Sequence, residues 1–236
     1  DEVTGSVELG PLAYMTVKAY RAYDNYKYED ASGGEPFFTG VTDTDGLVKI
    51  DLSSLSDNEQ YLVVATDDGS GVDISLLEQG ESDTSPIISE LRYDEVKSAP
   101  GVNSDIFINT ESTEISEYIQ LDTSSDTNKL EKAITKVKSR WGVTSNEIGT
   151  SYLRNGGNTR TSEMSMKRLM LMMAVKKVFA EYDNKVLLRA LFKFMSTFTG
   201  IMDLDDTGFF SSLLSSIETS LGISILVVLW VSITVS

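Results

Sequence analysis

Two residue types are absent from this sequence of 236 residues, and their absence removes whole classes of chemistry. Without cysteine there is no disulfide, thiolate nucleophile, zinc finger or iron–sulfur site, and without histidine the commonest general base is missing. Catalysis by carboxylates alone, as in glycoside hydrolases, needs two paired acids beside an aromatic-lined cleft, and no such pairing is visible. We therefore expect that the protein is not an enzyme.

Positive charge is also scarce. The chain holds 20 Lys and Arg against 36 Asp and Glu, which gives a formal net charge of −16. Nucleic acids and acidic membrane surfaces are bound through clustered Lys and Arg, so neither is an expected partner. Most of the acids lie in residues 1–126, with a net charge of −21, whereas residues 127–236 carry +5. Halves of opposite sign favour head-to-tail contact between copies, although a simple drift of surface charge between domains would look the same.

The first 100 residues have the pattern of an antiparallel β-sandwich. The chain is 41% hydrophobic, enough for a real core, and short apolar stretches alternate with turn residues. Residues 37–42 and 47–52 flank the turn Asp43-Thr-Asp-Gly46, and we read the pair as a β-hairpin in which Gly46 supplies a positive φ.

The same region resembles a known family. The residues that carry the resemblance are Val3-x-Gly5-x-Val7-x-x-Gly10-Pro11-Leu12, Val17-x-Ala19-Tyr20, Thr42-Asp43-x-Asp45-Gly46 and Tyr61-Leu-Val-Val-Ala65. This arrangement is similar to the prealbumin-like, carboxypeptidase-regulatory-like sandwich of bacterial surface proteins and lipoproteins. The resemblance implies an extracellular, non-catalytic domain that serves as a spacer or adhesion module.

A polar, acidic connection at residues 101–127 separates the sandwich from a helical domain at residues 128–222. Within the connection, residues 105–109 and 115–121 are too short to assign from periodicity. The helical domain begins with an amphipathic helix that ends at Gly142, with Asn128 as its expected N-cap. Further helices are expected over residues 162–182 and 185–198, and after a cap at Asp206 or Thr207. The middle of the second helix, residues 169–175, is apolar all round and should be buried.

Residues 223–236 read as a hydrophobic C-terminal β-strand. With a period of two, one face is wholly apolar; its residues are Ile223, Ile225, Val227, Leu229, Val231, Ile233 and Val235. A strand of this kind is expected to be covered by other parts of a protein. It either completes the sheet of its own domain or is donated to a neighbouring copy. A transmembrane helix, the third alternative, needs about 20 apolar residues, which is more than this segment has.

No cofactor is expected, with one candidate exception. Asp43 and Asp45 resemble the start of a calcium loop, but the distal Glu and further oxygen ligands of such a loop are missing, and a turn needs no ligand. No signal peptide is visible at Asp1, so we read the chain as a mature form whose signal peptide has been removed.

The fold class expected from these patterns is α+β, with an antiparallel sandwich, a mainly helical domain and a C-terminal strand. The function that fits best is a structural, self-assembling subunit outside the cell or on its surface. Copies would join head to tail by exchange of the C-terminal strand. The alternative is a monomeric, surface-anchored adhesion or carbohydrate-binding module.

Overall fold

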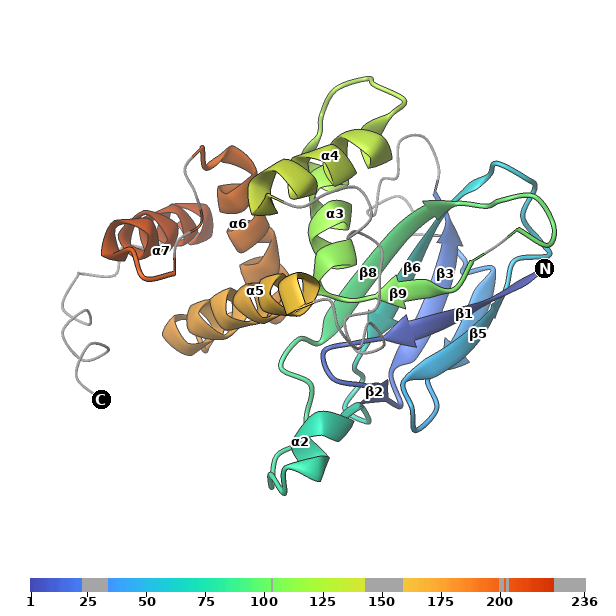
Figure 1. Cartoon of the computed structure of the whole chain (residues 1–236), viewed down its shortest axis with the longest axis horizontal. Coiled ribbons are helices and arrows are strands. Elements are labelled where there is room, and N and C mark those ends of the chain that lie inside the picture. The colour runs from blue at the N-terminus through green and yellow to red at the C-terminus, as the bar shows by residue number, and fades with distance from the viewer. Residues whose placement is uncertain (23–33, 103, 143–158, 200–201, 203, 223–236) are drawn as a thin grey trace.

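The protein is seen here in a computed structural model that describes residues 1–22, 34–102, 104–142, 159–199, 202 and 204–222. Apart from one short helix between β7 and β8, the strands come first along the chain and the helices follow, so the α+β class is confirmed (Figure 1). The strands are β1 (Glu2–Val7), β2 (Leu12–Ala13), β3 (Thr16–Arg21), β4 (Phe38–Val41), β5 (Leu47–Asp51), β6 (Gln60–Thr66), β7 (Val72–Asp73), β8 (Glu90–Val96) and β9 (Ile106–Ile108). The helices are α2 (Ile74–Glu78), α3 (Thr110–Leu121), α4 (Lys129–Trp141), α5 (Thr159–Val178), α6 (Asn184–Thr197) and α7 (Thr207–Leu221).

The described strands form three sheets. A four-stranded antiparallel sheet has the order β4-β3-β6-β8, and a three-stranded sheet has the order β5-β1-β9. In the second sheet β1 is antiparallel to β5 and parallel to β9, with Gly5 opposite Ile106. The short strands β2 and β7 pair separately. The parallel β1–β9 pair brings the two ends of the strand region together.

The expected hairpin around Asp43 is wrong. β4 pairs with β3, whereas β5 pairs with β1 in the other sheet, so the turn carries the chain from one sheet to the other. Gly46 has the predicted positive φ, +75°, and its carbonyl accepts a 2.9 Å hydrogen bond from the Val7 N–H. The turn and the two strands beside it were therefore predicted correctly, but their pairing with each other was not.

Helix α3 fills the range that we read as a connection. Its N-terminus has a reciprocal capping box, in which the Asn109 side chain accepts from the Ser112 N–H and the Ser112 hydroxyl accepts from the Asn109 N–H. All residues from Thr110 to Ile119 are buried. Because α3 contacts β8 and β9 on one side and α4, α5 and α6 on the other, it lies at the centre of the molecule.

Helices α4, α6 and α7 begin and end close to the expected residues, whereas α5 runs over Thr159–Val178 instead of 162–182 and α2 was not expected. Gly142 and Gly222 adopt the left-handed conformation and end α4 and α7, while the Asp206 carboxylate accepts from the Gly208 N–H and caps α7. Asn128 stands at the start of α4, but its side chain makes no capping hydrogen bond. The expectation that residues 169–175 are buried all round is wrong, because Met170 and Met173 are exposed.

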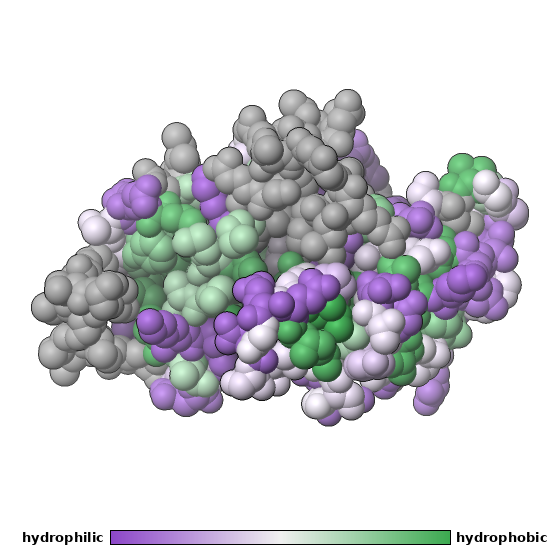
Figure 2. All heavy atoms as spheres, turned by 60° about the horizontal axis from the view of Figure 1, so that its bottom comes forward, coloured by the Kyte–Doolittle hydropathy of each residue, from purple (hydrophilic) through white to green (hydrophobic). Residues whose placement is uncertain are grey.

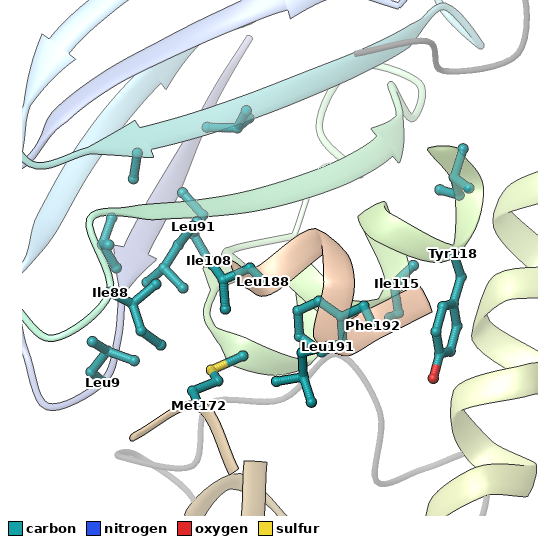
Figure 3. Close-up of a cluster of buried hydrophobic side chains, with 14 of the residues drawn as sticks. Leu9, Ile88, Leu91, Ile108, Ile115, Tyr118, Met172, Leu188, Leu191 and Phe192 are labelled. Carbon is teal, nitrogen blue, oxygen red and sulfur yellow. The ribbon is translucent and has the colours of Figure 1, made fainter. Parts of the chain in front are cut away.

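One continuous hydrophobic core joins the strands to the helices. Figure 3 shows where the two regions meet: Ile88, Leu91 and Ile108 come from the strand region and point toward Leu188 and Leu191 of α6. Met172 of α5 and Ile115 of α3 complete the junction. Each large apolar side chain that is buried stabilises the fold by about 1.5 to 3 kcal/mol. This shared core is therefore the main contribution that holds the two regions together.

Candidate functional site

The candidate calcium residues belong to a turn. One carboxylate oxygen of Asp43, Oδ1, accepts hydrogen bonds of 2.9 Å from the backbone N–H groups of Asp45 and Leu47. Asp45 is exposed beside it. Among the residues that the structure describes, no group of three acidic side chains is placed to hold a metal ion. Calcium at Asp43 and Asp45 stays a prediction, and the visible role of Asp43 is to fix the turn.

The predicted assembly residues of the C-terminal strand lie outside the described residues. The helix that leads to them, α7, lies at the end of the molecule away from β1 and β5 (Figure 1). The structure does describe the sheet edges with which an added strand could pair.

Strand β4 is the open edge of the four-stranded sheet. Within the described residues it pairs with β3 alone, over Phe38 to Val41. Thr39 and Val41 point outward, and Val41 is 58% exposed. Phe38 is packed against the core from this edge. An edge strand offers unpaired backbone groups to another strand, and this one has no charged side chain to discourage pairing.

Strand β8, at the other edge of the same sheet, is closed by α3. The Arg92 N–H donates a 3.0 Å hydrogen bond to the Thr113 hydroxyl, and the Ser112 hydroxyl donates a 2.6 Å bond to the Arg92 carbonyl. Side chains of the helix thus take the place that a neighbouring strand would occupy. The two edges of this sheet therefore differ: α3 bonds β8, whereas β4 pairs with β3 alone among the described strands.

Buried ionic groups gather around α3. Glu114 accepts hydrogen bonds from Arg168 Nε at 2.6 Å, from the Tyr118 hydroxyl at 2.7 Å and from Trp141 Nε1 at 3.0 Å. The Arg168 guanidinium also lies 4.7 Å from the centre of the Trp141 ring. Glu111 is 3.8 Å from Arg168. One carboxylate therefore links α3, α4 and α5.

A second group lies one turn further along α3. The Glu117 carboxylate contacts the Arg92 guanidinium of β8, and its Oε2 atom is 3.8 Å from Arg189 Nε of α6. Burial by itself lowers the pKa of Arg92, but the charges of Glu117 and Glu90 outweigh it and raise the pKa. Arg92 thus stays charged inside the protein, held by the carboxylates that surround it.

Asp94 is a buried acid whose pKa lies well above its ordinary value. The pKa of Asp94 is raised from 3.8 to about 7, and burial is the largest cause. The Ser116 hydroxyl and Arg92 act in the opposite direction, whereas the neighbouring carboxylates of Glu117 and Glu95 contribute to the rise. Asp94 is consequently a buried group whose charge changes near neutral pH.

These ion pairs join the acidic half of the chain to the basic half within one molecule. Glu111, Glu114 and Glu117 belong to the acidic half, and Arg168 and Arg189 to the basic half. The halves attract each other within one molecule at these positions. Only the charges that remain at the surface are left for contacts between copies.

The helical region carries two grooves. The first, about 310 Å³ between α5 and α7, is apolar, and its lining includes Val178, Phe210 and Leu214. The exposed methionines of α5 (Met166, Met170 and Met173) lie on the same helix, and Figure 2 shows a hydrophobic area on this side of the molecule. The second groove, about 350 Å³ between α6 and α7, combines an apolar floor with Lys185, Arg189 and Lys193.

The arrangement around α3 holds helices together. The Glu114 carboxylate is matched by arginine, tyrosine and tryptophan donors, and neither groove is lined by Glu111, Glu114 or Glu117. Sequence reasoning missed this network because its helix is polar. The capping pair Asn109 and Ser112, followed by apolar residues at 115, 118 and 119, is the signal that would have found the helix.

In the portion of the chain that is described, none of the helices has the length and apolar character needed to cross a bilayer. Comparison of the whole chain with known proteins finds no matching family model, no matching curated protein and no matching solved structure.

Proposed function

We propose that this chain is a non-catalytic structural subunit that associates with copies of itself outside the cell. In this proposal the two larger sheets form a sandwich of the prealbumin-like type, and residues 223–235 of one copy add a strand to β4 of the next copy. The single observation that carries the proposal is that, among the described strands, β4 pairs with β3 alone, while side chains of α3 bond β8 at the opposite edge of the sheet.

The donor segment has the properties that this edge requires. Strand addition binds through the backbone, while alternate side chains enter the acceptor. The apolar face of residues 223–235 would extend the core at the point where Phe37 and Phe38 are packed against it. Fourteen residues in extended form span at most about 50 Å, so the segment reaches well beyond the end of α7.

The ends of the molecule support a head-to-tail order. α7, from which the donor segment continues, lies at one end, and β5, which lies next to β4, lies at the other (Figure 1). A contact between unlike ends repeats from copy to copy and gives a filament when the rotation does not close. The extracellular location is supported by the resemblance of the first third of the chain to surface-protein sandwiches.

Deletion of residues 223–236 tests the proposal. The full chain is expected to form assemblies larger than a monomer, measured by sedimentation velocity and electron microscopy. The deleted chain is expected to stay folded by circular dichroism but to be monomeric, and a synthetic peptide of residues 223–236 should bind it. If the deletion unfolds the protein and the peptide does not restore it, the strand belongs to its own sheet. A folded monomer of full length that binds glycans would instead support the adhesion module.

A further inference from the structure

Helix α2 and the turn after it form a projecting tip, residues 74–83 (Figure 1). The tip presents one large apolar side chain, Leu77, which is 55% exposed. Around it stand the exposed acids Glu78, Glu81 and Asp83, and residues 77–83 contain no Lys or Arg. An exposed leucine surrounded by charges of one sign has the composition of a contact residue with a charged rim.

The tip is held in a defined conformation. Asp73 caps the helix through the Ser75 N–H, and the Ile74 N–H donates a 3.0 Å bond to the Pro11 carbonyl. After the helix, Gly80 adopts a φ of +78°, and its N–H bonds to the Leu77 carbonyl while the Glu81 N–H bonds to the Leu76 carbonyl. These two bonds are those of a Schellman motif. A pre-organised tip loses little conformational entropy on binding.

The groove between α6 and α7 has the complementary character. Its apolar lining includes Leu121, Ala190 and Leu221, together with Val186, which is 48% exposed. Basic side chains rim it at a helical spacing of four: Lys185, Arg189 and Lys193. The groove therefore offers an apolar floor inside a positive rim, which is the inverse of the α2 tip.

We infer that the α2 tip of one copy docks into the α6–α7 groove of a second copy. Leu77 contacts Val186 on the groove floor, and Glu78 and Glu81 face Lys185 and Lys193. The inference rests on the proposed self-association and names a second contact within it. Charge complementarity of this kind steers encounter and fixes register between partners.

The two contacts belong to the same pair of copies. Leu221 lines the groove and is the last residue of α7, so the groove lies at the end of α7 from which the chain continues to residue 223. In this inference the helical end of one copy offers both the groove and the donor strand. The strand region of the next copy offers the α2 tip and the β4 edge.

The test uses the full chain in sedimentation velocity at low and high salt. Glu78→Lys with Glu81→Lys is expected to weaken association at least about tenfold at low salt, because two attractive pairs become repulsive. Lys185→Glu with Lys193→Glu should weaken it similarly, and the chain with all four changes should regain most of the affinity. Unchanged association of either pair variant, or no recovery in the fourfold variant, would overturn the inference.

Single apolar substitutions provide a matched control. Leu77→Asp and Val186→Asp are each expected to abolish the groove contact while circular dichroism stays unchanged. Val102→Asp should have no effect, because Val102 is 66% exposed but lies in neither surface. Equal effects of all three substitutions would overturn the inference.

The strand proposal and the tip inference can fail separately. If only strand addition is wrong, deletion of residues 223–236 leaves association intact and Leu77→Asp removes it. If only the tip inference is wrong, Leu77→Asp associates like the unmodified chain and the deletion does not. A full chain that is monomeric at every salt concentration and protein concentration overturns both.

Discussion

Glu114 of α3 accepts a 2.6 Å hydrogen bond from Arg168 of α5, and both side chains are almost completely buried although 54 residues separate them in the chain. Two charges removed from water are stable only when each compensates the other and the remaining donors are matched. Tyr118 and Trp141 supply further donors to the same carboxylate. This pair ties the helices to one another at the centre of the fold.

Removing one member of this ion pair should lower the free energy of unfolding strongly. Glu114→Gln leaves the Arg168 charge buried with Glu111 at 3.8 Å as its nearest remaining acid. We expect the free energy of unfolding to fall by about 3 to 5 kcal/mol in urea denaturation, the range for breaking a buried ion pair. The double variant Glu114→Leu with Arg168→Met should recover most of the loss. A loss below about 1 kcal/mol in the single variant would show that the pair is not important for stability.

Asp94 makes the stability depend on pH. Its pKa is about 7 in the folded protein, above the ordinary value of 3.8, so between these values the unfolded chain releases a proton that the folded protein keeps. This group therefore lowers stability as pH rises from about 4 to about 7, and the loss is complete above that. Asp94→Asn should stabilise the protein by about 2 to 4 kcal/mol at pH 8 and have little effect at pH 4, measured by denaturation at each pH.

Ser116→Ala is the companion measurement. The Ser116 hydroxyl lowers the pKa of Asp94, so its removal should move the titration of the Asp94 carboxyl to higher pH in an NMR experiment. An unchanged titration would mean that the hydroxyl does not act on Asp94.

The turn that changes sheets should depend on Gly46. A Cβ atom there would lie 2.9 Å from the Leu12 backbone nitrogen and 3.0 Å from the Val7 carbonyl oxygen, in addition to the strain of a positive φ. Gly69 also has a positive φ, but a Cβ atom there meets nothing within 4 Å. Gly69→Ala should lower the free energy of unfolding by about 1 to 2 kcal/mol through backbone strain alone. Gly46→Ala should lower it by more, because the Cβ atom also meets backbone atoms. Thermal unfolding of the two variants measures the difference, and equal costs would contradict the close approach.

The edge of β4, to which the donor strand would be added, can be blocked without disturbing the core. Thr39 and Val41 are exposed on β4, so Thr39→Lys with Val41→Lys should change stability by less than about 1 kcal/mol. Lysines on an edge strand oppose the addition of another strand, and the double variant is expected to stop assembly. Electron microscopy that still shows assemblies of the folded variant would move the acceptor site away from β4.

The donor segment has an internal control in its two faces. Val227→Asp, Leu229→Asp or Val231→Asp places an unpaired carboxylate in the apolar face, at a cost of several kcal/mol, and assembly should fail while the subunit stays folded. Ser232→Asp and Thr234→Asp lie on the other face and should be tolerated far better. Sedimentation velocity compares the two sets, and equal loss from both faces would argue against a strand.

Several features of this protein follow from its sequence alone, because their signals are local. The helices α4, α6 and α7 were located within a few residues, since apolar spacing, the Asp206 cap and the glycines at 142 and 222 act within one or two turns. The positive φ of Gly46 was read from the turn residues beside it. The α+β class follows from the change of period between the two parts of the chain.

Only the tertiary structure decided which strands are partners and what α3 does. β4 pairs with β3, the strand before it, whereas β5 pairs with β1 at the start of the chain, and the turn between β4 and β5 is compatible with this arrangement or with a hairpin. Helix α3 was not recognised, since glutamates, serines and threonines are buried in it alongside Ile115, Tyr118 and Ile119, so that its apolar stripe is short. Those carboxylates are stable inside the protein only because they form ion pairs with Arg92 of β8 and Arg168 of α5. Such pairs join residues that are distant in the sequence, so no local pattern predicts them.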